Sequence, residues 1–340
     1  MDAMEFYLPI VWAVLIATAV VMYVILDGFD LGIGILFRFT RKEEERDTMI
    51  NTIAPFWDGN ETWLILGGGG LWVAFPQAYA IIMPANYLPV IVMLLALIFR
   101  GVSFEFRSVA KPRHGAWDLA FGAGSTVAAF AQGVILGSLI QGITVVDGKF
   151  AGGAFDWLTP FSVMCGVGLV LGYALLGATW LVARTEGDIE ARARGHARML
   201  LPAVLVFIAV VSLWTPLGFE RIQERWFSTP NIYFLWVLPA ATLLVAAGAW
   251  RWIGQGATVK PFIASIVLFL LCYVGLGIST FPYLVPPSVT VWQAAAVPDS
   301  QIFTLIGVLL MLPIILSYTV FVYWTFLRHG KVTVGSEGYH

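Results

Sequence analysis

Two pairs of carboxylates with the same spacing stand inside apolar segments. Asp27 and Asp30 occur in "ILDGFDLGIGILF", and Asp58 and Glu61 occur in "FWDGNETWLIL". Residues three apart lie on one face of an α-helix. A charged group at the centre of a membrane helix costs about 2.5–3.5 kcal/mol on insertion scales, so such groups normally face protein or a wet cavity. The pairs therefore indicate a functional polar track, because carboxylates with bound water can relay protons.

A basic residue interrupts a third apolar segment, "LIFRGVSFEFR", at Arg100. Arginine holds carboxylates through paired hydrogen bonds. We expect Arg100 to reach the same depth as both acidic pairs, so that four acids and one guanidinium form one layer. The same layer would also serve as a structural ion network that joins the helices.

The composition is that of an integral membrane protein. Of the 340 residues, 59% are hydrophobic and 12% are charged, and the mean hydropathy is +0.84. A net charge of −2 provides no basic field, which excludes nucleic acid as a partner. The first apolar run has neither a basic leader nor a small-residue cleavage site, so we expect it to remain as a span.

Apolar stretches that can cross a hydrocarbon core of about 30 Å are spaced along the whole chain. We expect nine transmembrane helices in an all-α fold with short loops. Their predicted ranges are 7–37, 54–76, 84–107, 118–143, 161–184, 199–217, 232–253, 262–285 and 302–327.

The distribution of basic residues predicts the orientation of these spans, because cytoplasmic loops collect Lys and Arg. With nine spans, 16 of the 19 basic residues, Lys111 and Arg113 among them, fall on one side. The other side has Lys149, Arg221 and Arg225. The N-terminus is therefore expected outside and the C-terminus in the cytoplasm, with both acidic pairs in the cytoplasmic half.

We predict one polytopic membrane domain over residues 1–340. Within it, residues 7–143 form a first four-helix bundle with the polar layer, and residues 161–285 form a second four-helix bundle. Residues 302–327 form a peripheral ninth helix.

Small and aromatic residues surround the acids. Gly28 and Gly32 have the GxxxG spacing that lets a neighbouring helix backbone approach. Trp57 and Trp63 flank the second acidic pair and are interpreted as interfacial anchors. Asn60 is grouped with these residues, in helix packing or anchoring near the acids.

Ligands for a metal or haem are not expected in this chain. The histidines fall in cytoplasmic loops or the tail, and the sequence contains neither HExxH nor CxxC; the four histidines are His114, His196, His329 and His340. Cys165 and Cys272 lie in apolar runs, where a thiol is usually a small buried hydrophobe.

Three segments together resemble subunit II of the cytochrome bd-type quinol oxidases, including the cyanide-insensitive branch. They are "ILDGFDLGIGIL", "NTIAPFWDGNETWLILGGGGLWVAFPQAYA" and "LIFRGVSFEFR". The resemblance extends from end to end, with a looser match in "GLGISTFPYLVPPSVTVWQAA".

The resemblance implies a respiratory complex in the bacterial inner membrane. Such a terminal oxidase couples oxidation of ubiquinol or menaquinol to reduction of dioxygen to water and generates a proton-motive force. Haem b and haem d are expected to be ligated by subunit I, the obligate partner. A small single-helix accessory subunit and a bound lipid or quinone are further partners expected from the resemblance.

Matched position by position, Asp30, Asp58 and Arg100 correspond to residues linked in that family to proton delivery from the cytoplasm. Asp27 is added to this proton pathway by its spacing. Glu61 belongs to it as well, at a position where some relatives carry a neutral amide. Two alternatives stay open, a proton-coupled secondary transporter and a purely structural subunit that conducts nothing.

Overall fold

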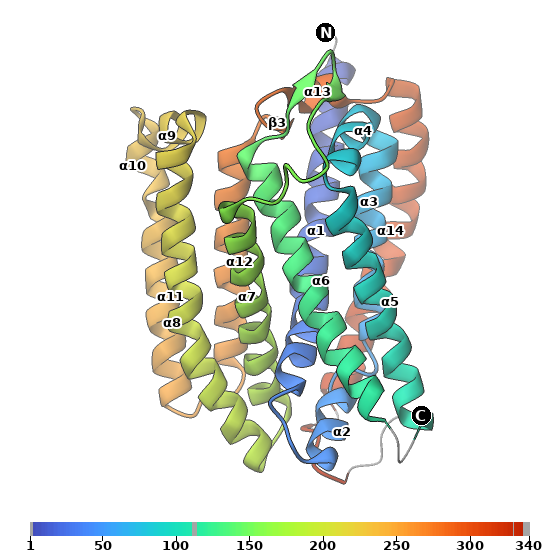
Figure 1. Ribbon diagram of the computed structural model, residues 1–340, viewed down its shortest axis with the longest axis vertical. Helices are drawn as coiled ribbons and strands as arrows, with labels where there is room; N and C mark the ends of the chain where they lie inside the picture. Colours follow the sequence, from blue (N-terminus) through green and yellow to red (C-terminus); the bar gives the residue numbers. More distant parts are fainter. Residues whose placement is uncertain (1–2, 111–113, 329, 336–340) are drawn as a thin grey trace.

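The fold is a set of long helices that run side by side along the longest axis of the molecule (Figure 1). The computed structural model describes residues 3–110, 114–328 and 330–335. Its helices are α1 Ala3–Phe37, α2 Glu43–Asn51, α3 Trp57–Ala74, α4 Pro76–Ala85, α5 Tyr87–Val109, α6 Gly115–Gln141, α7 Pro160–Arg184, α8 Gly187–Gly218, α9 Glu220–Phe227, α10 Asn231–Leu235, α11 Val237–Gly254, α12 Lys260–Thr280, α13 Val291–Ala294 and α14 Pro298–Leu327. The strands are β1 Val145–Val146, β2 Lys149–Phe150, β3 Tyr283–Val285 and β4 Val289–Thr290.

Eight helical segments in the described part of the chain are long and apolar enough to cross a membrane, so this is a multi-pass membrane protein. They are α1, α5, α6, α7, α8, α10 with α11, α12 and α14. The remaining predicted span, 54–76, contains helix α3, whose first two turns carry polar side chains, and it is not among the eight. The count of nine spans therefore stays a prediction.

Several predicted spans differ in their limits from the helices that form; the span predicted at 199–217, for example, lies in α8, which begins already at Gly187. The span predicted to end at residue 285 stops at Thr280, because Pro282 cannot continue a helix and the chain then pairs β3 with β4 in an antiparallel hairpin. The span predicted to begin at residue 84 is interrupted at Asn86, which separates α4 from α5. A second small hairpin, β1 with β2, adds to an otherwise helical fold.

Helix α1 is the centre of the packing, since it contacts α3, α6, α7, α12 and α14. Its closest neighbour is α7, where Gly32 and Gly177 face each other. A Cβ atom on Gly32 would overlap the backbone carbonyl of Tyr173, and one on Gly28 would press against the Tyr173 ring at 2.9 Å. The backbones of α1 and α7 can approach this closely because Gly32 and Gly177 both lack a side chain.

The helices form two neighbouring groups (Figure 1). Helices α1, α3, α5 and α6 pack together, α7, α8, α11 and α12 pack beside them, and α14 lies against α1 and α3. Both α1 and α6 also pack along α7, so contacts join the groups as well as separate them. The division at 7–143, 161–285 and 302–327 therefore remains a prediction.

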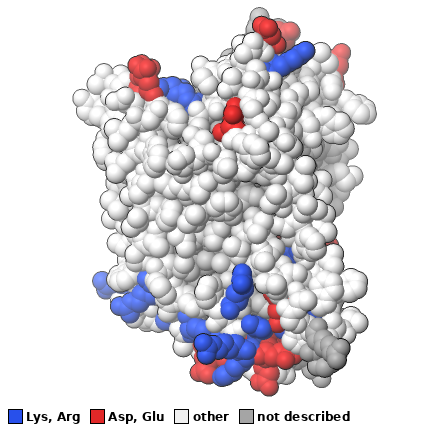
Figure 2. Space-filling model, viewed as in Figure 1, with Lys and Arg blue, Asp and Glu red and all other residues white. Residues whose placement is uncertain are grey.

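Charged side chains gather at the two ends of the molecule (Figure 2). On the face shown, an uncharged belt lies between them, and Lys and Arg are concentrated at the lower end, beside α2. This pattern is typical of a protein whose lower end faces the cytoplasm. Lys111 and Arg113, which were counted for the orientation, lie outside the described residues.

Labelling of single cysteines tests the orientation across one span, α7. Ala151 follows β2, Ala191 lies near the start of α8, and both are exposed. With Cys165 and Cys272 replaced by Ser, Ala151→Cys should react with a membrane-impermeant maleimide from the outside. Ala191→Cys should react only after the membrane is opened. Reaction of both positions in intact cells would contradict the predicted topology.

Candidate functional site

A guanidinium fully enclosed by protein forms the centre of the polar layer. The Arg100 side chain, on α5, is 0% exposed. Its Nη2 atom lies 3.2 Å from Asp27 Oδ1 and 3.8 Å from Asp30 Oδ2, both on α1. Its Nη1 atom lies 3.6 Å from Glu61 Oε2 on α3. Three helices thus bring one cation and three carboxylates together, and this set of four residues is called the buried charge cluster below.

Charge attraction rather than hydrogen bonding holds most of the cluster. Several of its atoms have no hydrogen-bond partner within the described residues. They are both oxygens of Asp27, the Oδ1 atom of Asp30 and all three guanidinium nitrogens of Arg100. Removing such groups from water costs several kcal/mol per ion unless other contacts compensate. The cluster therefore retains unused donors and acceptors at the place where its charges meet.

Asn60 binds directly to one of the acids. Its Nδ2 atom donates to Asp30 Oδ2 at 2.8 Å, and its Oδ1 atom accepts a hydrogen bond from the Tyr323 hydroxyl of α14 at 2.9 Å. The sequence placed Asn60 among packing or anchoring residues. The structure instead gives it a specific contact, with one carboxylate on one side and one phenol on the other.

A second hydrogen-bonded chain lies on another side of α1. The Tyr173 hydroxyl of α7 donates to Gln132 Oε1 at 2.8 Å, and Gln132 Nε2 of α6 donates to the Tyr23 hydroxyl at 2.7 Å. Sequence reasoning did not select these residues. A single amide in the apolar run "AAFAQGVILG" was the available signal, together with a tyrosine four residues before Asp27.

Asp58 does not join the cluster within this chain, because Arg100 pairs with Asp27, Asp30 and Glu61 only among the described residues, and the layer of four acids stays a prediction. It is exposed in the first turn of α3, and no ion pair or hydrogen bond to it is formed by the described residues. Three residues along a helix amount to a rise of about 4.5 Å and a rotation of about 60°. That difference directs Glu61 to Arg100 and leaves Asp58 on the surface, where its charge also suits a helix N-terminus.

Both tryptophans of the motif contact residues inside the protein, which differs from the interfacial anchoring expected from the sequence. The guanidinium carbon of Arg100 lies 5.2 Å from the centre of the Trp57 ring, a cation–π contact that supports the buried charge. Trp63 is only 3% exposed and packs with Ala19 and Tyr23 of α1. Of the two roles predicted for this group, helix packing or anchoring, the burial of Trp63 favours helix packing.

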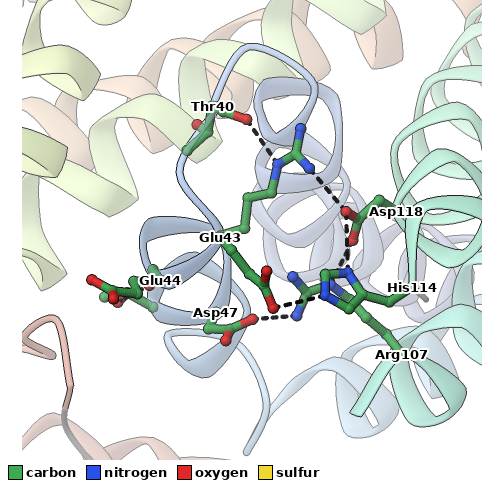
Figure 3. A network of polar contacts seen from close by, with 9 residues as sticks. Thr40, Glu43, Glu44, Asp47, Arg107, His114 and Asp118 are labelled. Atoms are coloured by element: carbon green, nitrogen blue, oxygen red, sulfur yellow. Dashed lines mark hydrogen bonds and ion pairs between the residues drawn. The ribbon is translucent and has the colours of Figure 1, made fainter. Parts of the chain in front are cut away.

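A separate ion network closes the end of this group of helices that is predicted to be cytoplasmic (Figure 3). Arg107, two turns beyond Arg100 on α5, donates to Asp118 of α6 at 2.6 Å and pairs with Asp47 of α2. Arg46 also binds Asp118, at 2.9 Å. His114 lies 2.7 Å from Glu43. In the sequence, Arg46 and Arg107 served only to predict the orientation of the spans.

The network continues sideways to α8. Arg192 Nη1 donates to Glu45 Oε2 at 2.7 Å, and Lys42 lies 3.2 Å from the other oxygen of the same carboxyl. The hydrogen bond from Arg192 holds the pKa of Glu45 below its ordinary value. Helix α2 is thus fastened to α8 by an acid that stays ionised at neutral pH.

Possible ligands for a metal or haem are sparse in the described residues. No group of three or more His, Cys, Asp and Glu side chains there could hold a metal ion. His114 and His196 lie in the part of the chain predicted to be cytoplasmic, at the start of α6 and near the start of α8. His329 and His340 lie outside the described residues.

Comparisons with known proteins agree along nearly the full chain. The family described as "Cytochrome bd terminal oxidase subunit II" matches residues 8–326. The "Cytochrome bd-I ubiquinol oxidase subunit 2" of Escherichia coli (strain K12) is 33% identical over 374 residues, covering 96% of this chain and 95% of that protein. The "Cytochrome bd ubiquinol oxidase subunit 2" of Bacillus subtilis (strain 168) is 31% identical over 327 residues, covering 93% and 95%.

A solved structure shows the same fold. "The structure of bd oxidase from Geobacillus thermodenitrificans" contains a chain that matches this one with a TM-score of 0.74 at 16% identity, over 95% of this chain and 99% of that chain. This chain therefore belongs to the cytochrome bd terminal oxidase subunit II family and is a supporting component of a quinol:oxygen oxidoreductase complex of the respiratory chain.

Proposed function

We propose that the buried charge cluster is part of a route that carries protons from the cytoplasmic side toward the oxygen-reducing site of the complex. The observation that carries the proposal is the burial of Arg100 among three carboxylates with donors and acceptors left unused. Ionisable groups inside a membrane protein are costly, and they characteristically mark proton relays and ion pathways.

The geometry supports a simple exchange of charge. Asp27 and Asp30 lie near the same nitrogen of Arg100, at 3.2 and 3.8 Å. When one carboxylate takes up a proton, the guanidinium still faces the other, so the layer keeps a counter-charge. Reduction of dioxygen to water consumes protons, and a chain of such acids provides a path that hydrocarbon does not.

The surface of α3 offers a place for the route to leave this chain. Glu61 is 27% exposed although it lies against the fully buried Arg100. Asp58, one turn earlier on α3, is exposed. Charged groups on a membrane helix normally face protein or water rather than lipid. We therefore propose that this part of α3 faces subunit I, and that Asp58 acts there despite its distance from Arg100.

We infer that the ligands of the haems are provided by subunit I rather than by this chain. Haem b and haem d would supply the electron transfer and oxygen chemistry of the complex, and an axial histidine is a common haem ligand. The described histidines do not fit that role, because His114 pairs with Glu43 at 2.7 Å and His196 lies near the predicted cytoplasmic end of α8. Ligation by subunit I is therefore part of the proposal.

The setting of the complex follows from the family. We place the protein in the bacterial cytoplasmic membrane, where quinol oxidation with proton uptake from inside builds a proton-motive force. A single-helix accessory subunit and a bound lipid or quinone stay predictions. Family membership argues against the transporter alternative. The purely structural alternative is tested by the substitutions below.

The substitution Asp30→Asn distinguishes a proton-relay role of the cluster from a purely structural role. The amide oxygen can still accept from Asn60, whose bond to Asp30 is 2.8 Å long, so packing is retained while a titratable proton site is removed. We expect quinol-driven oxygen consumption per haem to fall by roughly 10²-fold, the scale of a lost proton-transfer group. Asp188→Asn, at an 81% exposed carboxyl on α8, is the matched control and should leave turnover unchanged. Normal turnover per haem in Asp30→Asn would leave only the structural role.

Asp58 is expected to respond differently from Asp30. Because the described residues form no ion pair with it, both Asp58→Asn and Asp58→Ala should lower the stability of this chain by no more than about 1 kcal/mol, the scale of a lost charge at a helix N-terminus. Both should slow oxygen consumption per haem to a similar extent if the carboxylate passes protons to the partner. Thermal unfolding of the purified complex and oxygen uptake measure the two effects separately. Unimpaired uptake in both variants would remove Asp58 from the route.

Replacement of the histidines tests where the haems are held. In the complete complex, His114→Gln combined with Ala at positions 196, 329 and 340 should leave the haem content per complex intact. Glutamine is chosen for His114 because that side chain is 7% exposed and bonded to Glu43. The visible spectrum of the dithionite-reduced complex reports each haem. Loss of one haem band would show that this chain provides a ligand.

A further inference from the structure

A tyrosine–amide chain ends at one buried aspartate of α1, Asp30, and a second chain ends one helical turn before the other, Asp27. At Asp30 the order is Tyr323, Asn60, Asp30, with hydrogen bonds of 2.9 and 2.8 Å. At the other side of α1 the order is Tyr173, Gln132, Tyr23, with bonds of 2.8 and 2.7 Å. Tyr23 lies four residues before Asp27, one helical turn away on the same face.

The donors and acceptors in the second chain have one direction. Gln132 Oε1 accepts from Tyr173, so its Nε2 atom is the group that donates to the Tyr23 oxygen. The Tyr23 oxygen is then an acceptor toward Gln132, and its own hydrogen must point elsewhere. Tyr23 and Asp27 are both buried, one helical turn apart on the same face of α1, and the Asp27 oxygens have no hydrogen-bond partner among the described residues. The Asp27 carboxyl is therefore an acceptor toward which that hydrogen can point.

We propose that Gln132 is a positioning residue of the proton route, which turns the Tyr23 hydroxyl toward Asp27 and so sets how that carboxyl shares Arg100 with Asp30. This inference rests on the proposed function. In this arrangement Asn60 orients Asp30 directly, whereas Gln132 acts on Asp27 through Tyr23. Asp30 is thus held by α3 and α14, whereas α6 and α7 act on Asp27 only through the position of the Tyr23 hydroxyl.

The hydrogen-bonded chain from Tyr173 to Tyr23 is buried, so its role in proton delivery can be tested separately from its role in packing. Tyr23 is 4% exposed and Tyr173 is 0% exposed, so neither hydroxyl exchanges freely with solvent in the described structure. A single interhelical hydrogen bond in a membrane contributes little to stability, so loss of one or two such bonds should leave the helices assembled. Misplacement of a reacting group, by contrast, reduces turnover strongly.

The experiment compares substitutions that remove hydrogen bonds and keep volume, in the complete complex. Gln132→Met removes both amide bonds, and Tyr23→Phe removes only the hydroxyl. Tyr273→Phe is the matched control, because that hydroxyl also bonds to α1, at Ala17 O and 2.8 Å, but outside the chain. Oxygen consumption per haem is measured over a range of quinol concentrations.

Gln132→Met and Tyr23→Phe should each lower kcat by roughly 5–10-fold with the KM for quinol unchanged, as expected for a misplaced group in proton delivery. The double variant should be no slower than either single variant, since both act through one hydroxyl. The control should keep the kcat of the unmodified complex. If Gln132→Met and Tyr23→Phe fail to assemble, Tyr173→Phe decides. It keeps the bond between Gln132 and Tyr23 and should lower kcat by about twofold.

Two results overturn the inference. Normal kcat in Gln132→Met and Tyr23→Phe, or in Tyr173→Phe alone when only that variant assembles, would leave the chain with a packing role. An effect of the same size in Tyr273→Phe would also contradict it. Asp30→Asn distinguishes this from failure of the proposed function. If Asp30→Asn is slow and the Gln132 variant is normal, the proton route stands and only the positioning role is lost.

Discussion

The burial of the Arg100 guanidinium is the constraint on which the rest of the structure depends. A cation removed from water inside a helix bundle requires opposite charges close by, or the helix that carries it is not stable there. Helix α1 provides Asp27 and Asp30 at 3.2 and 3.8 Å, and α3 provides Glu61 at 3.6 Å. The contacts of α1 with α3, and the reach of α5 toward both, follow from that requirement.

Glycine residues, which have no side chain, also make the central position of α1 possible. Gly32 meets Gly177 of α7 without side chains between the backbones. This close approach brings Tyr173 of α7 beside α1, where its hydroxyl reaches the Gln132 amide. Helix packing and the orientation of a polar side chain are thus consequences of the same small residues. The carboxylates are placed by α1 itself, and their surroundings are placed by its neighbours.

A second charged layer closes the end of the molecule that is predicted to be cytoplasmic. Arg107, Asp118 and Asp47 link α5, α6 and α2 in one ion network (Figure 3). The Phe37 ring at the end of α1 lies 5.2 Å from the guanidinium carbon of Arg46 and 5.4 Å from that of Arg107. In the proposed proton route, protons from this side would pass a charged layer that is balanced by its own acids before they meet the more deeply buried cluster.

The sequence by itself determined the membrane class, the approximate spans, the family and the meeting of Asp27, Asp30 and Arg100. Hydropathy, basic loops and three-residue spacing act locally along the chain, so they can be read without coordinates. Only the tertiary structure separated Asp58 from Glu61 and buried Trp63, because the rotation of α3 relative to its neighbours depends on packing. It also joined Tyr23 to Gln132, 109 residues apart. Pairing over such separations is set by which helix faces meet, and no local pattern in the sequence encodes it.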